Sequence, residues 1–147
     1  GALLGVAAAG IVAAIAIPAY QDYTVRAQVA SVLAESDPLK QAMAEYYFKN
    51  KRLPRSSEDL RLGFEGDSLK YLEGYGIDGG AVVLVFGDEA DAALKERTLL
   101  LTPYLGIDGR LLWVCGNANP PAGVKPLASA VESASDIPDQ YLPKACR

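Results

Sequence analysis

The chain of 147 residues contains no histidine, one methionine, one tryptophan and only two cysteines. Histidine and cysteine are the usual members of catalytic triads and zinc sites, so both kinds of site lack their common residues here. The net charge of −4 also argues against general affinity for nucleic acid. We therefore expect neither an enzyme nor a cofactor or metal site.

Charge is also absent from residues 1–19, which are all Gly, Ala, Leu, Val, Ile or Pro. As a helix this segment spans ~28 Å, close to the ~30 Å hydrocarbon thickness of a bilayer. A cleavable signal peptide would have a basic segment and a shorter apolar core. A buried core helix would be shorter or polar on one face. A membrane-compatible helix is the interpretation that the segment favours.

Polar side chains begin soon after Pro18 with no turn-forming residues between, so the same helix is expected to continue. Over residues 20–50 its apolar positions form one stripe of an amphipathic helix, interrupted by Ser36. The stripe consists of Val25, Val29, Val32, Leu39, Met43 and Tyr46. Pro38 lacks a backbone donor and is expected to kink the helix without necessarily ending it. A helix of ~50 residues and ~75 Å needs lipid or other subunits to cover it.

Residues 51–70 mix charge with proline, serine and glycine and are expected to form a surface connection. Short runs rich in β-branched and aromatic residues follow, separated by turn sequences. They predict four strands, at residues 70–77, 81–87, 97–105 and 110–116. The predicted fold class is therefore α+β, with a long N-terminal helix packed on an antiparallel sheet of about four strands.

No strand pattern is found after Gly116, where a proline-rich segment begins. Cys115 and Cys146 flank this segment. If the apolar helix is an anchor, the C-terminal part lies outside the cytoplasm, where a disulfide between the two would persist and close a loop. The alternative is two unrelated buried thiols.

Two motifs have an ordinary structural explanation. Gly74, Gly76 and Gly79 match the dinucleotide-binding pattern G-x-G-x-x-G, but a strand follows in place of the required helix. Ser36 and Lys40 could form a serine–lysine pair, but on a helix flank they are expected to be solvated.

One basic cluster lies where the helix ends. It consists of Lys49, Lys51, Arg52 and Arg55. The cluster could contact DNA or an anionic surface weakly. The alternative is a solvated face that helps acidic neighbouring subunits to associate.

The order of these parts resembles that of the type IV pilins. GIVAAIAIPAYQDYTVRAQV, residues 10–29, looks like the family's N-terminal helix nearly letter for letter. AEYYFKNKRLP resembles the exit from that helix into the αβ-loop, and WVCG and YLPKACR resemble the two ends of the disulfide-bounded D-region. The matches occur at both ends and in the middle of the chain, in the right order.

The resemblance implies a single pilin subunit over residues 1–147 with a disulfide-closed C-terminal loop. Its parts would be an apolar half of the helix at 1–19, an amphipathic half at 20–50, an αβ-loop at 51–70, and the sheet and D-region of the head at 71–147. The apolar half would lie in the inner membrane before assembly and in the filament core afterwards, with the head extracytoplasmic. Gly10 and Pro18 would mark where the helix bends or loses hydrogen bonds when subunits pack.

The function implied by the resemblance is that of a structural subunit of an extracellular pilus filament, supporting adhesion, twitching motility or DNA uptake. The implied partners are other copies of the chain, the inner membrane and the pilus assembly machinery. There is one departure, because the position of a family glutamate that pairs with a neighbouring subunit falls at Gly1. The alternative function is therefore a membrane-anchored, pilin-like binding or sensor module that does not polymerise.

Small residues recur every four positions in the apolar segment, at Gly1, Gly5, Ala9 and Ala13. Helices already in lipid gain little hydrophobic energy on meeting, so close packing of such a ridge would supply the attraction. We expect Ala9→Leu or Ala13→Leu to reduce the yield of sheared filaments severalfold through steric overlap, with membrane insertion intact. Leu4→Ile changes shape without adding volume and is the control. Unchanged yield in both alanine variants would mean that alanine is only a good helix former here.

Overall fold

The computed structural model describes residues 2–62 and 69–147, with the backbone alone for residues 2–17. Two helices lead the chain, α1 (Ala2–Glu35) and α2 (Asp37–Asn50). The strands are β1 (Leu72–Asp78), β2 (Ala81–Phe86), β3 (Thr98–Leu105), β4 (Leu111–Cys115) and β5 (Lys125–Pro126). Short 3-10 helices are η1 (Ser57–Leu60), η2 (Asp139–Tyr141) and η3 (Lys144–Cys146).

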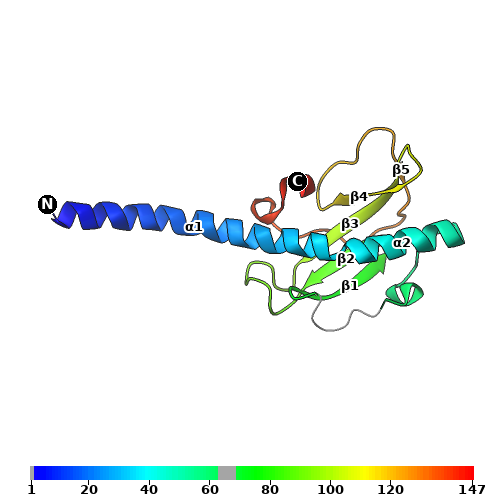
Figure 1. Ribbon diagram of the computed structural model, residues 1–147, viewed down its shortest axis with the longest axis horizontal. Coiled ribbons are helices and arrows are strands. Elements are labelled where there is room, and N and C mark those ends of the chain that lie inside the picture. The colour runs from blue at the N-terminus through cyan, green and yellow to red at the C-terminus, as the bar shows by residue number, and fades with distance from the viewer. Residues whose placement is uncertain (1, 63–68) are drawn as a thin grey trace.

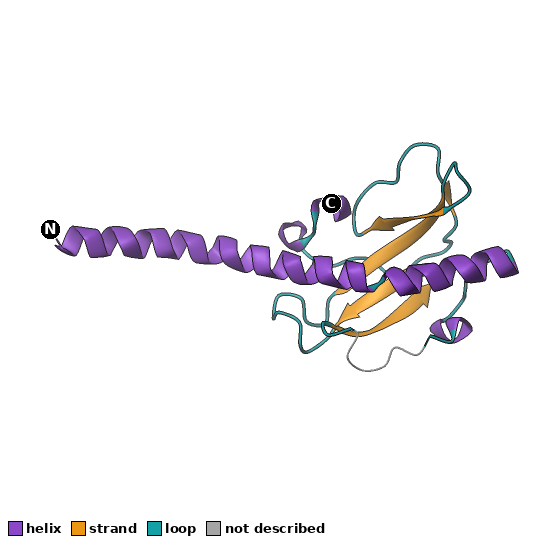
Figure 2. Ribbon diagram, viewed as in Figure 1, coloured by secondary structure: helices purple, strands orange, loops and turns teal. Residues whose placement is uncertain are grey.

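The helices form a long rod with the sheet at one end of it. Figure 1 shows α1 and α2 running in one direction, with the strands against α2 and the C-terminal part of α1. We call the sheet, its loops and the C-terminal segment the head. Figure 2 shows the N-terminal part of α1 reaching well beyond the head. The predicted α+β fold, one long helix on an antiparallel sheet, is confirmed.

The predicted apolar stripe of the helix is the side that faces the head. Each of five stripe residues is at most 2% exposed: Val25, Val29, Val32, Leu39 and Met43. They form one core with buried side chains that alternate along β2 and β3, namely Val82, Leu84, Phe86, Leu99 and Leu101. The residues that the helical period places on one face of the helix therefore pack against those that the strand period places on one face of the sheet, in a single apolar layer.

The four main strands form an antiparallel sheet in the order β1-β2-β3-β4. Their bounds differ from the predicted ones by at most two residues. Asp78 pairs with Ala81 across a two-residue turn. Gly79 and Gly80 fill that turn with φ values of 59° and 93°, a left-handed conformation that glycine adopts without a steric penalty.

The sequence prediction missed a fifth strand in the C-terminal segment. β5 has two residues and pairs with Tyr104 and Leu105 of β3. β2 pairs only with residues 98–101 of β3, so β5 occupies the part of β3 beyond β2. A two-residue strand that includes a proline has no periodic pattern of its own, and its position beside β3 alone defines it.

Further hydrogen bonds hold the C-terminal segment to the sheet. The Ser129 N–H donates to the Gly79 carbonyl oxygen at 2.9 Å. In β3, the Leu100 N–H donates to the Ser135 hydroxyl at 2.8 Å, and the Thr98 N–H donates to the Asp136 carboxylate at 2.7 Å. The proline-rich segment is therefore fastened along its length, although it contains little regular secondary structure.

Cys115 and Cys146 form a disulfide bond. It joins the end of β4 to η3 across 31 positions of sequence, and Cys146 is fully buried. The alternative of two unrelated thiols is therefore wrong. In the loop-closure model a bond of this span stabilises the folded chain by about 3.5–4 kcal/mol.

Several predicted features fall on residues or side chains outside those that the structure describes. They are the side-chain contacts of the apolar segment over residues 1–17 and of the small-residue ridge of Gly1, Gly5, Ala9 and Ala13, whereas the backbone of α1 runs through Gly10 as uninterrupted helix. α1 runs through Pro18 without interruption, and Pro18 is exposed. Over the part of the chain that is described, no helix is both long and apolar enough to cross a membrane.

Candidate functional site

The long helix is interrupted once, at Ser36. Pro38 is the second residue of α2 and has no N–H to donate. Helical bonding continues around it, because the Ser36 N–H donates to the Val32 carbonyl oxygen at 3.0 Å and the Lys40 N–H donates to that of Ser36 at 3.0 Å. α2 therefore resumes in the direction of α1 (Figure 1).

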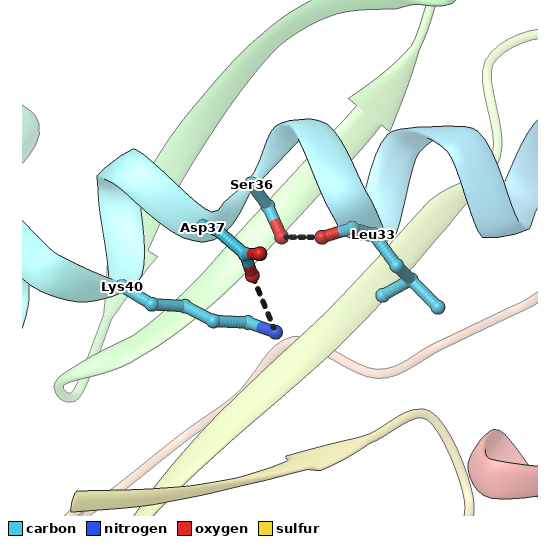
Figure 3. Close-up of polar contacts among 4 residues, drawn as sticks. All are labelled: Leu33, Ser36, Asp37 and Lys40. Carbon is cyan, nitrogen blue, oxygen red and sulfur yellow. Dashed lines mark hydrogen bonds and ion pairs between the residues drawn. The ribbon is translucent and has the colours of Figure 1, made fainter.

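Ser36 and Lys40 do not form a serine–lysine pair. The Ser36 hydroxyl donates to the Leu33 carbonyl oxygen at 2.6 Å, whereas the Lys40 ammonium lies 3.8 Å from the Asp37 carboxylate (Figure 3). Ser36 is only 2% exposed, so the expectation that it is solvated was wrong. A hydroxyl that bonds to its own helix is satisfied, and it can therefore occupy the apolar stripe.

Three of the four predicted basic residues gather where α2 ends. Lys51, Arg52 and Arg55 line a pocket of ≈ 490 Å³ beside the β1–β2 turn and β5. The Arg52 guanidinium lies 5.3 Å from the centroid of the Tyr46 ring, within the range of a cation–π contact. Lys49 is exposed but lies outside this pocket. We call Lys51, Arg52 and Arg55 the basic tip, which lies at the end of the head far from the N-terminus (Figure 1).

Carboxylates gather at the other end of the sheet, around the β2–β3 loop and the start of β1. We call them the acidic rim: Glu73, Asp88, Glu89 and Glu96, all exposed. They line a pocket of ≈ 700 Å³ that contains one cation, Lys70. Among the described residues, no group of three or more histidine, cysteine, aspartate or glutamate side chains could hold a metal ion.

A groove of ≈ 520 Å³ separates α1 from the C-terminal end of the chain. Its floor includes Ala27 and Ala30 of α1, and its charged side chains are Arg26, Lys144 and Arg147. We call these three cations the basic groove. The Arg26 guanidinium donates two hydrogen bonds to the carbonyl oxygen of Gln140, at 2.9 and 3.2 Å, and these bonds hold η2 beside α1.

Comparison with known protein families shows which family this chain belongs to. The family described as pilin (bacterial filament) matches residues 25–147, which include the amphipathic helix, the sheet and the disulfide. The chain belongs to the pilin family. The resemblance noted in the sequence is thereby confirmed.

Individual relatives match over nearly all of this pilin. A fimbrial protein of Neisseria meningitidis serogroup A is 28% identical over 152 residues, covering 99% of this chain and 89% of the relative. The type IV major pilin protein PilE1 of Neisseria gonorrhoeae is 28% identical over 149 residues, covering 99% and 82%. A fimbrial protein of Pseudomonas aeruginosa is 33% identical over 138 residues, covering 84% and 86%.

Sequence reasoning about this pilin found the cysteines and the basic cluster but neither the acidic rim nor the basic groove. Arg26 and Gln140 meet although 114 positions separate them. The adjacent pair Asp88 and Glu89 of the β2–β3 loop is visible in the sequence, but Glu73 comes from β1. No local pattern could have signalled either surface.

The Asp78 carboxylate at the end of β1 is a further anchor of the C-terminal segment. One of its oxygens accepts the N–H groups of Glu132 at 3.0 Å and Ser133 at 2.7 Å. Hydrogen bonds from the side chain and backbone of Ser133 lower the pKa of Asp78 below its ordinary value of 3.8. The charged form of Asp78 is therefore the one that fastens this segment to the β1–β2 turn.

A lowered pKa in the folded state means that Asp78 stabilises the head above the ordinary aspartate pKa, and that this contribution is lost as pH falls through the folded pKa. Asp78→Asn should therefore lower the thermal midpoint of the detergent-solubilised pilin by a few degrees at pH 7. The difference from the wild type should shrink as pH falls through the lowered pKa of Asp78 in the folded state. Asp88→Asn, an exposed carboxylate of the acidic rim, is the matched control. Equal midpoints for the wild type and Asp78→Asn at pH 7 would refute the anchor.

Proposed function

We propose that this pilin is the structural subunit of a type IV pilus, an extracellular filament made of many copies of the chain. The observation that carries the proposal is the N-terminal part of α1, which leaves the head (Figure 2) and is purely apolar in sequence over residues 1–19. Such a segment needs lipid or other copies of itself to cover it. The relatives named type IV major pilins, matched over 99% of this chain, support the same role.

The apolar half of the helix is surrounded first by lipid and then, after assembly, by other copies of the chain. Before assembly the apolar half lies in the inner membrane and the head lies outside the cytoplasm, where the Cys115–Cys146 bond persists. The pilus assembly machinery then transfers the subunit to the filament. There the apolar halves pack as the core, through the small-residue ridge, and the heads form the outer surface.

Filaments sheared from the producing cells test this proposal. We expect electron microscopy to show filaments whose main component by mass spectrometry is this chain, and both should disappear when its gene is deleted. Loss of adhesion, twitching motility or DNA uptake in the deletion strain, restored by the gene, would assign the task of the filament. Sheared filaments that lack the chain, with the chain retained in the membrane fraction, would instead favour the anchored, non-polymerising module, which neither the family match nor the relatives support.

A second proposal is that the basic tip makes weak contact with DNA or another polyanion. Lys51, Arg52 and Arg55 are all exposed and share one pocket. The tip lies at the end of the head away from the apolar half, so it stays accessible when that half enters the filament core (Figure 1). The overall net charge of −4 keeps this affinity low.

The salt dependence of DNA binding distinguishes direct contact at the basic tip from general attraction between DNA and the rest of the protein. Each phosphate contact to duplex DNA contributes about 0.9 to the slope of log K against log salt, so replacing all three tip cations with glutamine should reduce the slope by about 2.7. Lys49→Gln, a cation outside the pocket, is the control and should change the slope little. The measurement is DNA binding by detergent-solubilised pilin at several salt concentrations. Equal slopes for the wild type and the triple variant would rule out the tip as the DNA contact.

A further inference from the structure

We propose that neighbouring copies of this pilin dock side by side, with the acidic rim of one head seated in the basic groove of the next. The inference rests on the proposed filament function. It adds the contact that would set how adjacent heads are oriented.

The two surfaces are complementary in charge. The acidic rim presents four carboxylates around one lysine, and the basic groove presents three cations and no carboxylate side chain. Of the residues that the structure describes, only Asp37 and Lys40 form an ion pair, so the charges of neither surface are held in ion pairs within the chain. Surfaces of opposite charge steer association and set its orientation.

The two surfaces lie on opposite flanks of α1 at the same height along it. The acidic flank is fixed by the Asp91 N–H, which donates to the Gln28 side-chain oxygen at 2.8 Å. The basic flank is fixed by the bonds from Arg26 to Gln140. Two residues correspond to about 200° of rotation around a helix, so these bonds leave α1 on nearly opposite sides. Figure 1 shows the β2–β3 loop and the C-terminal end on either side of α1.

This placement favours an open assembly. A contact between two different surfaces of the same chain is heterologous, so every copy keeps one free flank after it has bound a neighbour. Such a contact repeats into a helical filament unless the rotation happens to close a ring. A self-complementary patch would instead close into a dimer.

The floor of the groove has the shape and polarity that a docked loop would need. Tyr23, Ala27 and Ala30 follow one face of α1, turned away from the buried stripe, and Ala27 and Ala30 leave room above the helix. Tyr23 is 67% exposed and Tyr20, one turn earlier, is 70% exposed. A neighbour's β2–β3 loop would cover this apolar floor with its carboxylates among the cations, an apolar centre with a polar rim.

Charge reversal with rescue tests the contact. The groove variant carries Lys144→Glu and Arg147→Glu, and the rim variant carries Asp88→Lys and Glu89→Lys. Arg26 stays unchanged because it holds η2. Each variant places like charges together and should reduce the yield of sheared filaments about tenfold. A chain that carries all four changes restores complementarity between copies and should recover most of the yield. Arg110→Glu in the β3–β4 loop and Glu45→Lys in α2 change exposed charges that line neither surface, so these controls should assemble normally.

Cross-linking of wild-type filaments is the second measurement. A carbodiimide joins carboxylates to amines that touch, so we expect cross-linked peptides between Lys144 and Asp88 or Glu89. Filaments that contain this chain but give no such peptide, or a groove variant with normal yield, would overturn the proposed contact and leave the filament function standing. Absence of the chain from wild-type filaments would show at the first step and would overturn the filament function itself.

Discussion

A long helix whose one apolar stripe must be buried is the constraint on which the rest of this pilin depends. Val29, Val32 and Met43 are fully inaccessible, and each such side chain contributes about 1.5–3 kcal/mol when it leaves water. The sheet supplies the matching apolar face through alternate residues of β2 and β3. Because a helix has two sides, the opposite side of α1 stays exposed and carries Tyr20 and Tyr23. The fold and the proposed assembly surface therefore both depend on α1.

The C-terminal segment illustrates how a proline-rich stretch with few apolar residues becomes part of a fixed head. It cannot order itself by hydrophobic burial alone, since its backbone is largely outside regular secondary structure. Attachments to the rest of the chain add to that contribution, among them the disulfide, β5, the Asp78 carboxylate and the bonds from Arg26. The consequence is geometric as well as energetic. These attachments hold Lys144 and Arg147 beside α1, and without them the basic groove would not exist.

The three charged surfaces of this pilin lie at two different positions along the long helix. The basic tip lies where α2 ends, and the acidic rim and basic groove flank α1 near the point where it leaves the head (Figure 1). A subunit proposed to place its apolar half in a filament core needs lateral contacts near that core and an accessible surface away from it. The acidic rim and the basic groove lie near that core, and the basic tip lies away from it. A chain with a modest net charge of −4 can thus carry strongly charged local sites of both signs.

The sequence by itself determined the elements whose signal is local. The stripe at Val25, Val29 and Val32 follows the helical period, the Gly79–Gly80 pair specifies a hairpin turn, and the strands are short runs rich in β-branched and aromatic residues, so each could be predicted from a few neighbouring residues. The motifs at both ends of the chain likewise sufficed to suggest the pilin family. Only the tertiary structure decided that β5 pairs with β3, that Ser36 is buried, and that Arg26 meets Gln140 across 114 positions. Those outcomes depend on which distant segment supplies a hydrogen-bond partner, and no short window of sequence contains both partners.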